Sequence, residues 1–353
     1  MDSVVLIYKG IYILAIFGIS LLIATYSTYF ERKIAAFIQD RVGPNRAGPM
    51  GLLQPLADAG KLFFKEEFIP AKANKTLFIL GPGIAMLVAA MSSAVIPFGD
   101  TLILGETSFD LIAIDVNIGI LYIFGVVSLG VYGLMIGGWA SNNKFSLLGA
   151  IRAASQNISY ELAMGLSLIA VLMLSGSLSL KVIAEQQAGF NWNIWYQPLG
   201  FLIFLICAFA ETNRTPFDLP ESEAELIGGY HTEYSSMKLG MYLFAEYINI
   251  FVVSAVMATL YFGAYNFPFM ENLRNAFDDP VLGNNVVTIL GVVVMFAKIF
   301  AFIFFFMWVR WTLPRFRYDQ LMKLGWNILI PLAILNILLT GGGILLYEYF
   351  TKG

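Results

Sequence analysis

The sequence predicts an all-α polytopic membrane protein with eight transmembrane helices and one amphipathic helix on the cytoplasmic side of the membrane. The first observation is composition, since 58% of the 353 residues are hydrophobic and the mean hydropathy is +0.74. A soluble domain has an apolar share of only about 45–50%. The second observation is that long apolar runs recur along the whole chain. We therefore expect one membrane domain over residues 1–353.

Eight apolar runs meet or approach the roughly 20 residues that a transmembrane helix needs. The first run is too long for the apolar region of a signal peptide, so we expect it to remain as the first span. The fifth run is short and begins at Pro198. The predicted spans are 4–30, 76–98, 111–139, 158–180, 198–212, 238–265, 286–309 and 326–349.

Basic residues concentrate in alternate loops, and this pattern sets the orientation of a membrane protein. Most of the 21 lysines and arginines fall in four predicted loops, 31–75, 140–157, 213–238 and 310–323. The loops on the other side are almost free of them. We therefore expect a multi-pass membrane protein with both termini non-cytoplasmic and the basic loops in the cytoplasm, or in the matrix of an organelle.

Residues 51–67 are predicted to form the amphipathic helix. Apolar side chains recur there at helical spacing, and the polar residues Gln54, Asp58, Lys61 and Lys65 follow at steps of four, three and four. This pattern is typical of a helix that lies along the interface. A plain surface anchor carries lysine and arginine on its polar face, so Asp58 favours a binding site over a simple anchor.

The most acidic stretch of the chain runs from residue 211 to 225. Like charges packed this closely repel one another and raise one another's pKa, so their protons are exchanged near neutrality. We interpret the stretch as a proton-handling loop, and the alternative is a hydrated acidic connector. It contains one arginine, Arg214, and five carboxylates, Glu211, Asp218, Glu221, Glu223 and Glu225.

Four ionisable residues fall within predicted spans: Asp115, Glu161, Glu246 and Lys298. An ionisable side chain at the bilayer centre costs roughly 2.5–3.5 kcal/mol, so such residues commonly mark ion paths. Asp115 and Glu161 lie close to span ends and have a structural explanation as well. Glu246 lies about 12 Å and Lys298 about 18 Å from the nearest basic loop residue at 1.5 Å per residue, so we expect both to be intramembrane.

The chain has too few metal ligands for a redox centre of its own. One cysteine and one histidine exclude a four-cysteine iron–sulfur site, a mixed cysteine and histidine zinc site and a bis-histidine haem within this chain. No metal site is expected, and any redox centre must lie in a partner.

Several motifs in one order resemble a known family. They are Glu31-Arg-Lys, Gln39-Asp-Arg-Val-Gly-Pro-Asn-Arg46, Gly51-Leu-Leu-Gln-Pro-Leu-Ala-Asp58, Glu211-Thr-Asn-Arg-Thr-Pro-Phe-Asp218, Ala245-Glu-Tyr247 and Leu313-Pro-Arg-Phe-Arg-Tyr-Asp-Gln-Leu-Met322. From about residue 20 to residue 335 the chain resembles the quinone-site membrane subunits of respiratory complex I, which are the H subunit of the bacterial enzyme and mitochondrial NADH dehydrogenase subunit 1.

The resemblance implies a role for most of the singled-out residues. A quinone tunnel would be lined by Glu31, Arg32, Arg41, Asp58 and Lys61. A proton path would use Glu211, Asp218, Glu221, Glu223, Glu225, Glu161 and Glu246. The loop residues Arg214, Arg315, Arg317 and Asp319 would be structural.

The resemblance also implies a location, substrates and partners. The chain would lie in the bacterial cell (inner) membrane. Quinone would be the substrate, with ubiquinone and menaquinone both open, and the enzyme would be a proton-translocating NADH:quinone oxidoreductase. Flavin and iron–sulfur clusters would lie in partner subunits. The partners would be peripheral iron–sulfur and quinone-site subunits, small membrane subunits and antiporter-like subunits, together with membrane lipid and without nucleic acid.

Two other functions remain open at this point. The homologous subunit of a membrane-bound hydrogenase would share the Pro216-Phe-Asp218 loop but lack a quinone tunnel. A stand-alone cation/proton transporter would show inverted repeats with interrupted helices, and no such repeat is evident in the sequence.

Overall fold

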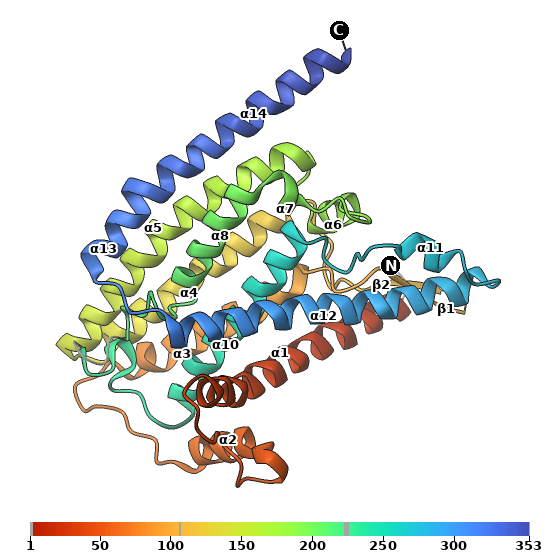
Figure 1. The fold of residues 1–353 in the computed structure, drawn as a ribbon. Helices are drawn as coiled ribbons and strands as arrows, with labels where there is room; N and C mark the ends of the chain where they lie inside the picture. The colour runs from red at the N-terminus through yellow and green to blue at the C-terminus, as the bar shows by residue number, and fades with distance from the viewer. Residues whose placement is uncertain (1–2, 106, 222–225, 353) are drawn as a thin grey trace.

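Helices dominate the computed structural model, which describes residues 3–105, 107–221 and 226–352. The long helices form one bundle, in which α5 and α14 run nearly parallel and α12 is less steeply inclined in the view (Figure 1). Seven of the described helices, counting the last together with the turns that precede it, are long and apolar enough to cross a membrane. They are α1 Ser3–Ile38, α3 Lys75–Ser92, α4 Gly119–Ala140, α5 Lys144–Ser175, α10 Ser236–Tyr261, α12 Pro280–Thr312 and α14 Ile330–Lys352. The predicted all-α polytopic fold is confirmed.

The fifth predicted span forms a helix, α8 Pro198–Glu211, that is shorter than the others. Its 14 residues reach about 21 Å at 1.5 Å per residue, less than the roughly 30 Å of a typical hydrocarbon layer. Proline is favoured at the first turn of a helix because its missing N–H is not needed there, which explains the start at Pro198. The helix packs against α5, α10 and α14.

Short elements connect the long helices. The predicted amphipathic helix is α2 Gln54–Phe64, preceded by a 3-10 turn over Pro49–Gly51. A π-helical turn over Leu324–Leu329 leads into α14. The remaining short helices and strands are α6 Leu180–Gln186, α7 Asn193–Tyr196, α11 Met270–Arg274, α13 Tyr318–Lys323, β1 Thr101–Leu104 and β2 Thr107–Asp110.

The structure corrects two predicted boundaries. Residues 144–157 belong to α5, not to a loop, because Asn143 caps the helix by accepting a hydrogen bond from the backbone N–H of Phe145 at 2.9 Å. The placement of Asp115 in a span was wrong. The chain before Asp115 forms the antiparallel hairpin of β1 and β2. Helix α4 begins only at Gly119, so Asp115 lies in the segment between the hairpin and the helix, where it is exposed.

Helix α10 forms the centre of the bundle. In its most apolar window, 83% of the residues are buried inside the protein, against 22% for α1 and 28% for α12. Helices α1, α3 and α12 pack around it. Any charged side chain on α10 therefore lies in protein and not in lipid, and Glu246 is such a residue.

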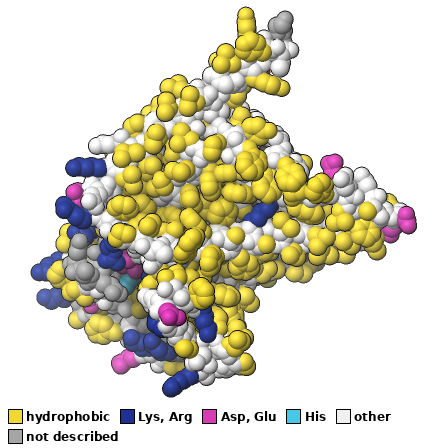
Figure 2. All heavy atoms as spheres, viewed as in Figure 1, with side chains coloured by type: hydrophobic (Ala, Val, Ile, Leu, Met, Phe, Trp, Pro, Cys, Tyr) yellow, Lys and Arg dark blue, Asp and Glu magenta, His cyan; other side chains and the backbone are white. Residues whose placement is uncertain are grey.

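Charge is divided between the two ends of the molecule. Figure 2 shows lysine and arginine gathered at the end where α2 and α13 lie, and carboxylates at the tip of the opposite end. The surface between the ends is mainly apolar in this view. The first turns of α1 lie near the hairpin of β1 and β2, away from the basic end (Figure 1).

The loop after α8 is folded into the body of the protein. The amide Nε2 of Gln156 on α5 donates to the carbonyl oxygens of Ala210 and Phe217 at 2.8 and 2.9 Å. Gly229 has a φ of 61°, and a Cβ there would lie 1.8 Å from the carbonyl oxygen of Pro220. Only glycine fits this close approach.

Gly229→Ala should therefore destabilise the loop and the full chain. A left-handed conformation costs a non-glycine residue about 1–2 kcal/mol, and the clash with the Pro220 backbone adds to this. The matched control is Gly228→Ala, because a Cβ at Gly228 would lie 3.3 Å from the movable Thr232 side chain. Thermal unfolding of both variants of the full chain in detergent measures the difference, and equal stability would contradict the prediction.

Candidate functional site

A cavity of about 260 Å³ lies between α1, α2 and α10. Helix α2 places Asp58 there, and its carboxylate accepts a hydrogen bond from Gln54 at 3.2 Å and pairs with the guanidinium of Arg32 on α1 at 2.8 Å. Lys61 also lines the cavity, and Leu243 and Phe244 of α10 form part of its apolar wall. The structure thus brings together Arg32, Asp58 and Lys61 of the predicted quinone-site residues.

The other two predicted quinone-site residues do not line this cavity. Arg41 is exposed beyond the end of α1, where its Nε donates to Oε1 of Gln39 at 2.7 Å. Glu31 is buried behind the cavity wall. Tyr247, a wall residue, donates its hydroxyl hydrogen to Oε2 of Glu31 at 2.8 Å, so one hydrogen bond separates the cavity from Glu31.

Arg214 joins two buried carboxylates from different helices. Its Nη1 lies 3.5 Å from Oε2 of Glu31 on α1, and its Nη2 lies 3.4 Å from Oε2 of Glu246 on α10. All three side chains are at most 10% exposed. We call this group the Glu31–Arg214–Glu246 cluster. Arg214 was predicted to be a structural loop residue, and the structure places it at the centre of the site.

The guanidinium of Arg214 remains charged in this setting. Burial alone would lower its pKa, but the neighbouring Tyr247 and the surrounding carboxylates raise the pKa above its ordinary value. The guanidinium also lies 4.2 Å from the centre of the Tyr247 ring, a cation–π contact. The cluster therefore holds one permanent positive charge between two buried carboxylates.

Further donors complete the cluster. Arg310, near the end of α12, pairs with Oε1 of Glu31 at 2.5 Å. Tyr230 donates its hydroxyl hydrogen to Oε1 of Glu246 at 2.8 Å. The sequence analysis gave no site role to Tyr230, Tyr247 or Arg310. Two signals in the sequence could have indicated a site role: Tyr247 directly follows Glu246, and Arg310 lies at the end of an apolar span.

The acidic loop carries two more pairs. Nε2 of His231 lies 3.3 Å from Oε1 of Glu221. Burial alone would raise the pKa of Glu221, but hydrogen bonding to His231, the charge of His231 and hydrogen bonding to Glu246 lower it to about 2. The same pairing outweighs burial at His231 and raises its pKa. Sequence reasoning also missed His231.

Asp218 pairs with Arg315 at 2.7 Å. Burial and the charge of Glu221 raise the pKa of Asp218 to about 6, against the lowering effect of Arg315. This carboxyl therefore exchanges its proton closer to neutrality than a free aspartate does. Arg317 and Asp319 form an exposed pair at 3.0 Å, away from the cluster. Glu223 and Glu225 lie outside the described residues.

Two small cavities continue from the cluster into the bundle. One, of about 30 Å³, is lined by Glu246, Glu211, Tyr230 and Asn157, and the second, also of about 30 Å³, by Glu211 and Glu161. Because a water molecule needs about 10–15 Å³ of such space, each has room for about two waters. Glu211 lines both, and one of its carboxylate oxygens is buried without a hydrogen-bond partner among the described residues.

Glu161 and Lys298 differ in their surroundings. Glu161 accepts a hydrogen bond from the hydroxyl of Ser128 on α4 and faces the second cavity. Lys298 donates three hydrogen bonds of 2.7 Å to the carbonyl oxygens of Phe262, Ala264 and Asn266. Lysine suits the carbonyls that a helix end leaves unpaired, so Lys298 fixes the chain after α10 and does not join the carboxylate path.

Within residues 3–105, 107–221 and 226–352, no group of three or more histidine, cysteine or carboxylate side chains is arranged to hold a metal.

The chain is similar to known proteins over nearly its full length. Residues 11–341 match the model of the family described as NADH dehydrogenase. The NADH-quinone oxidoreductase H subunit 1 of Cytophaga hutchinsonii is 66% identical over 97% of this chain and 98% of its own. The H subunit of Flavobacterium johnsoniae is 63% identical over 99% and 98%. NADH-quinone oxidoreductase subunit 8 of Rhodothermus marinus is 48% identical over 93% and 94%.

Proposed function

The chain belongs to the family of NADH-quinone oxidoreductase H subunits, and from this premise we propose that it binds the quinone and couples its reduction to proton translocation. The observation that carries the proposal is the continuity between the α2 cavity and the carboxylates of the bundle through Tyr247 and the Glu31–Arg214–Glu246 cluster.

The α2 cavity has the two properties that a quinone requires. Its apolar wall on α10 suits an isoprenoid tail, and Arg32, Asp58 and Lys61 offer polar contacts to a head group. Helix α2 exposes Phe63 and Phe64 on its outer side, as expected for a helix that lies on a lipid surface. A quinone could then enter from the membrane without crossing water.

Reduction of the quinone creates a demand for two protons. The two electrons would come from flavin and iron–sulfur clusters in partner subunits. The quinone takes up two electrons and two protons to become a quinol. Before the protons arrive, negative charge in the cavity would repel the nearby carboxylates and favour their protonation.

The cluster can pass this electrostatic change into the bundle. The Tyr247 hydroxyl touches Glu31, and Arg214 bridges Glu31 to Glu246. If Glu31 becomes neutral, Arg214 loses one of its two carboxylate partners and its attraction for Glu246 changes. A proton leaving the region of Glu246 would reach Glu211 and then Glu161 through the two small cavities.

The division of charge supports the orientation that we propose. Basic side chains surround the α2 end of the molecule (Figure 2), so this end would face the cytoplasm of a bacterium. The quinone cavity and the acidic loop would then open toward the peripheral subunits, and both termini would be non-cytoplasmic. Glu161 would pass protons toward the antiporter-like subunits.

Asp58→Asn should weaken quinone use by the assembled complex. The change removes the negative charge that pairs with Arg32 at 2.8 Å, and losing a hydrogen bond that involves a charged group costs about 1.5–3 kcal/mol. We expect the KM for quinone to rise about 10-fold or more on that scale, while NADH oxidation with ferricyanide continues.

The matched control is Glu66→Gln, because Glu66 is exposed just beyond α2 and does not line the cavity. Steady-state kinetics with a short-chain quinone measures both variants. An unchanged KM in Asp58→Asn, with assembly confirmed, would contradict the proposed quinone site. Equal loss of quinone and ferricyanide activity would indicate failed assembly, and binding of a quinone analogue to the purified full chain, with and without Asp58→Asn, would then decide.

A further inference from the structure

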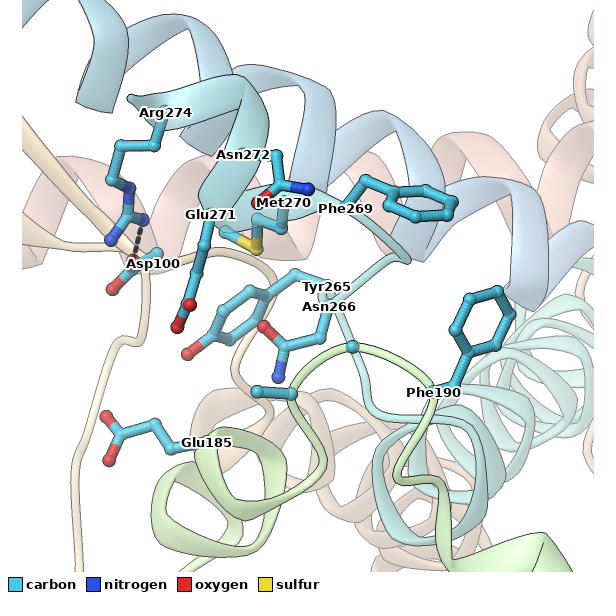
Figure 3. A pocket seen from close by; sticks show the side chains of 12 residues that line it. Asp100, Glu185, Phe190, Tyr265, Asn266, Phe269, Met270, Glu271, Asn272 and Arg274 are labelled. Carbon is cyan, nitrogen blue, oxygen red and sulfur yellow. Dashed lines mark hydrogen bonds and ion pairs between the residues drawn. The ribbon is translucent and has the colours of Figure 1, made fainter. Parts of the chain in front are cut away.

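A large cavity lies at the end of the molecule opposite to α2. Its volume is about 630 Å³. It is formed by α6 and the loop after it, by residues 265–270 with α11, and by Asp100 before β1 (Figure 3). Nothing in the proposed quinone and proton function uses this cavity.

The charged groups of the cavity are mainly acidic. Glu185, Glu271 and Asp100 line it, and Arg274 is the one basic lining residue among those described. Arg274 is already engaged with Asp100 at 2.7 Å. The carboxylates of Glu185 and Glu271 face the cavity without an ion pair among the described residues (Figure 3). The cavity therefore keeps two unpaired negative charges.

A buried tyrosine also lines the cavity. Tyr265 is 3% exposed, and no hydrogen bond of its hydroxyl occurs within the described part of the chain. Figure 3 shows this hydroxyl pointing into the space between Glu271 and Glu185. Burial and the charge of Asp100 raise the pKa of Tyr265, so it stays a neutral hydroxyl that can accept a hydrogen bond from a ligand.

Aromatic rings form the outer rim. Phe190 and Phe269 are 63% and 69% exposed, and their ring centres lie 5.9 Å apart at 88°. Phe269 has a φ of 65°, a conformation that is unfavourable for a bulky residue. Figure 3 shows the two rings across the cavity from Glu185 and Glu271. A cavity that holds both aromatic rings and carboxylates suits an organic cation, because the ring quadrupole and the carboxylates both attract positive charge.

We propose that this cavity binds an organic ammonium or guanidinium group, with Glu185 and Glu271 as its counter-ions, the Tyr265 hydroxyl as a hydrogen-bond acceptor and Phe190 and Phe269 as the aromatic rim. The group comes either from a basic side chain of a neighbouring subunit or from a free organic cation. The site does not depend on the quinone proposal, because it lies at the other end of the chain.

Charged thiol reagents test the preference of the cavity for cations. Ala188 lines the cavity and is exposed, whereas Asn191 is exposed three residues later outside it. The native Cys207 is buried and should stay unreactive. The full chain carrying Ala188→Cys or Asn191→Cys is treated in detergent with methanethiosulfonates bearing a trimethylammonium or a sulfonate group, and intact mass measures each rate.

The cation-to-anion rate ratio at Ala188→Cys should exceed that at Asn191→Cys by about 10-fold or more at low salt, since charge-lined clefts accelerate association of counter-ions by 10–10³. Adding Glu185→Gln and Glu271→Gln should lower the cation-to-anion rate ratio at Ala188→Cys to the value at Asn191→Cys. Similar ratios at both positions, or a ratio unchanged by the glutamines, would overturn the proposal. Asn272→Cys replaces Ala188→Cys if the latter does not fold.

The assembled complex distinguishes the two sources of the cation. If a neighbouring subunit supplies it, assembly should block labelling at Ala188→Cys, and the two glutamine substitutions should restore labelling by releasing the basic side chain. If the cation is free, labelling should persist after assembly and butylguanidinium should slow it. Blocked labelling that the glutamines do not restore, or persistent labelling that butylguanidinium does not slow, would count against the site.

Discussion

Arg214→Met should destabilise the full chain by about 3–5 kcal/mol, the usual cost of removing one partner from a buried ion pair. Arg214 is 7% exposed and lies between Glu31 and Glu246. Methionine matches much of the volume but leaves carboxylates in the bundle without their shared cation. The free energy of unfolding of the full chain in mixed detergent micelles measures the effect.

The matched control for this change is Arg317→Met. Arg317 also pairs with a carboxylate, at 3.0 Å, but its side chain is 76% exposed, so the expected cost is only about 0–1 kcal/mol. Adding Glu31→Gln and Glu246→Gln to Arg214→Met should recover part of the lost stability, because neutral amides do not require a cation. Equal costs for the two arginine variants would show that the cluster is not an essential buried ion group.

Glu246→Gln should abolish proton pumping by the assembled complex. Glutamine keeps the size and hydrogen-bonding capacity of the side chain but cannot exchange a proton. Positioned acid–base groups commonly contribute about 10²–10⁴-fold to a rate, so a loss of about 10²-fold in pumping is expected. Quinone reduction should fall with it where the steps are tightly coupled, and Glu211→Gln should behave in the same way.

The control for the proton path is Asp115→Asn, a carboxylate that is exposed before α4 and remote from both small cavities. Proteoliposomes containing the complex, with an internal pH dye and quinone reduction followed together, measure all three variants. Near wild-type pumping and turnover in both Glu246→Gln and Glu211→Gln, with assembly confirmed, would make these acids structural and the proposed path wrong.

Some residues that the structure places in the candidate site could be predicted from the sequence, and others could not. Asp58 and Lys61 could be predicted because they follow a helical period on α2, and local period determines which side chains share a face. The position of Glu246 inside the bundle could be predicted because an acidic residue within a transmembrane run normally faces protein or water. Arg214 was visible only as one cation in an acidic loop. Its role depends on α1 and α10, which are far away in the sequence.

The sequence by itself determined the fold class and the family, because these follow from composition, apolar run length and local motifs. Only the tertiary structure decided that Tyr247 connects the α2 cavity to Glu31, that Arg310 reaches the same carboxylate, and that Arg41 stays outside. It also decided that α8 is short and that Asp115 lies outside a span. Helix packing sets these contacts between residues distant in the chain, and no local pattern encodes them.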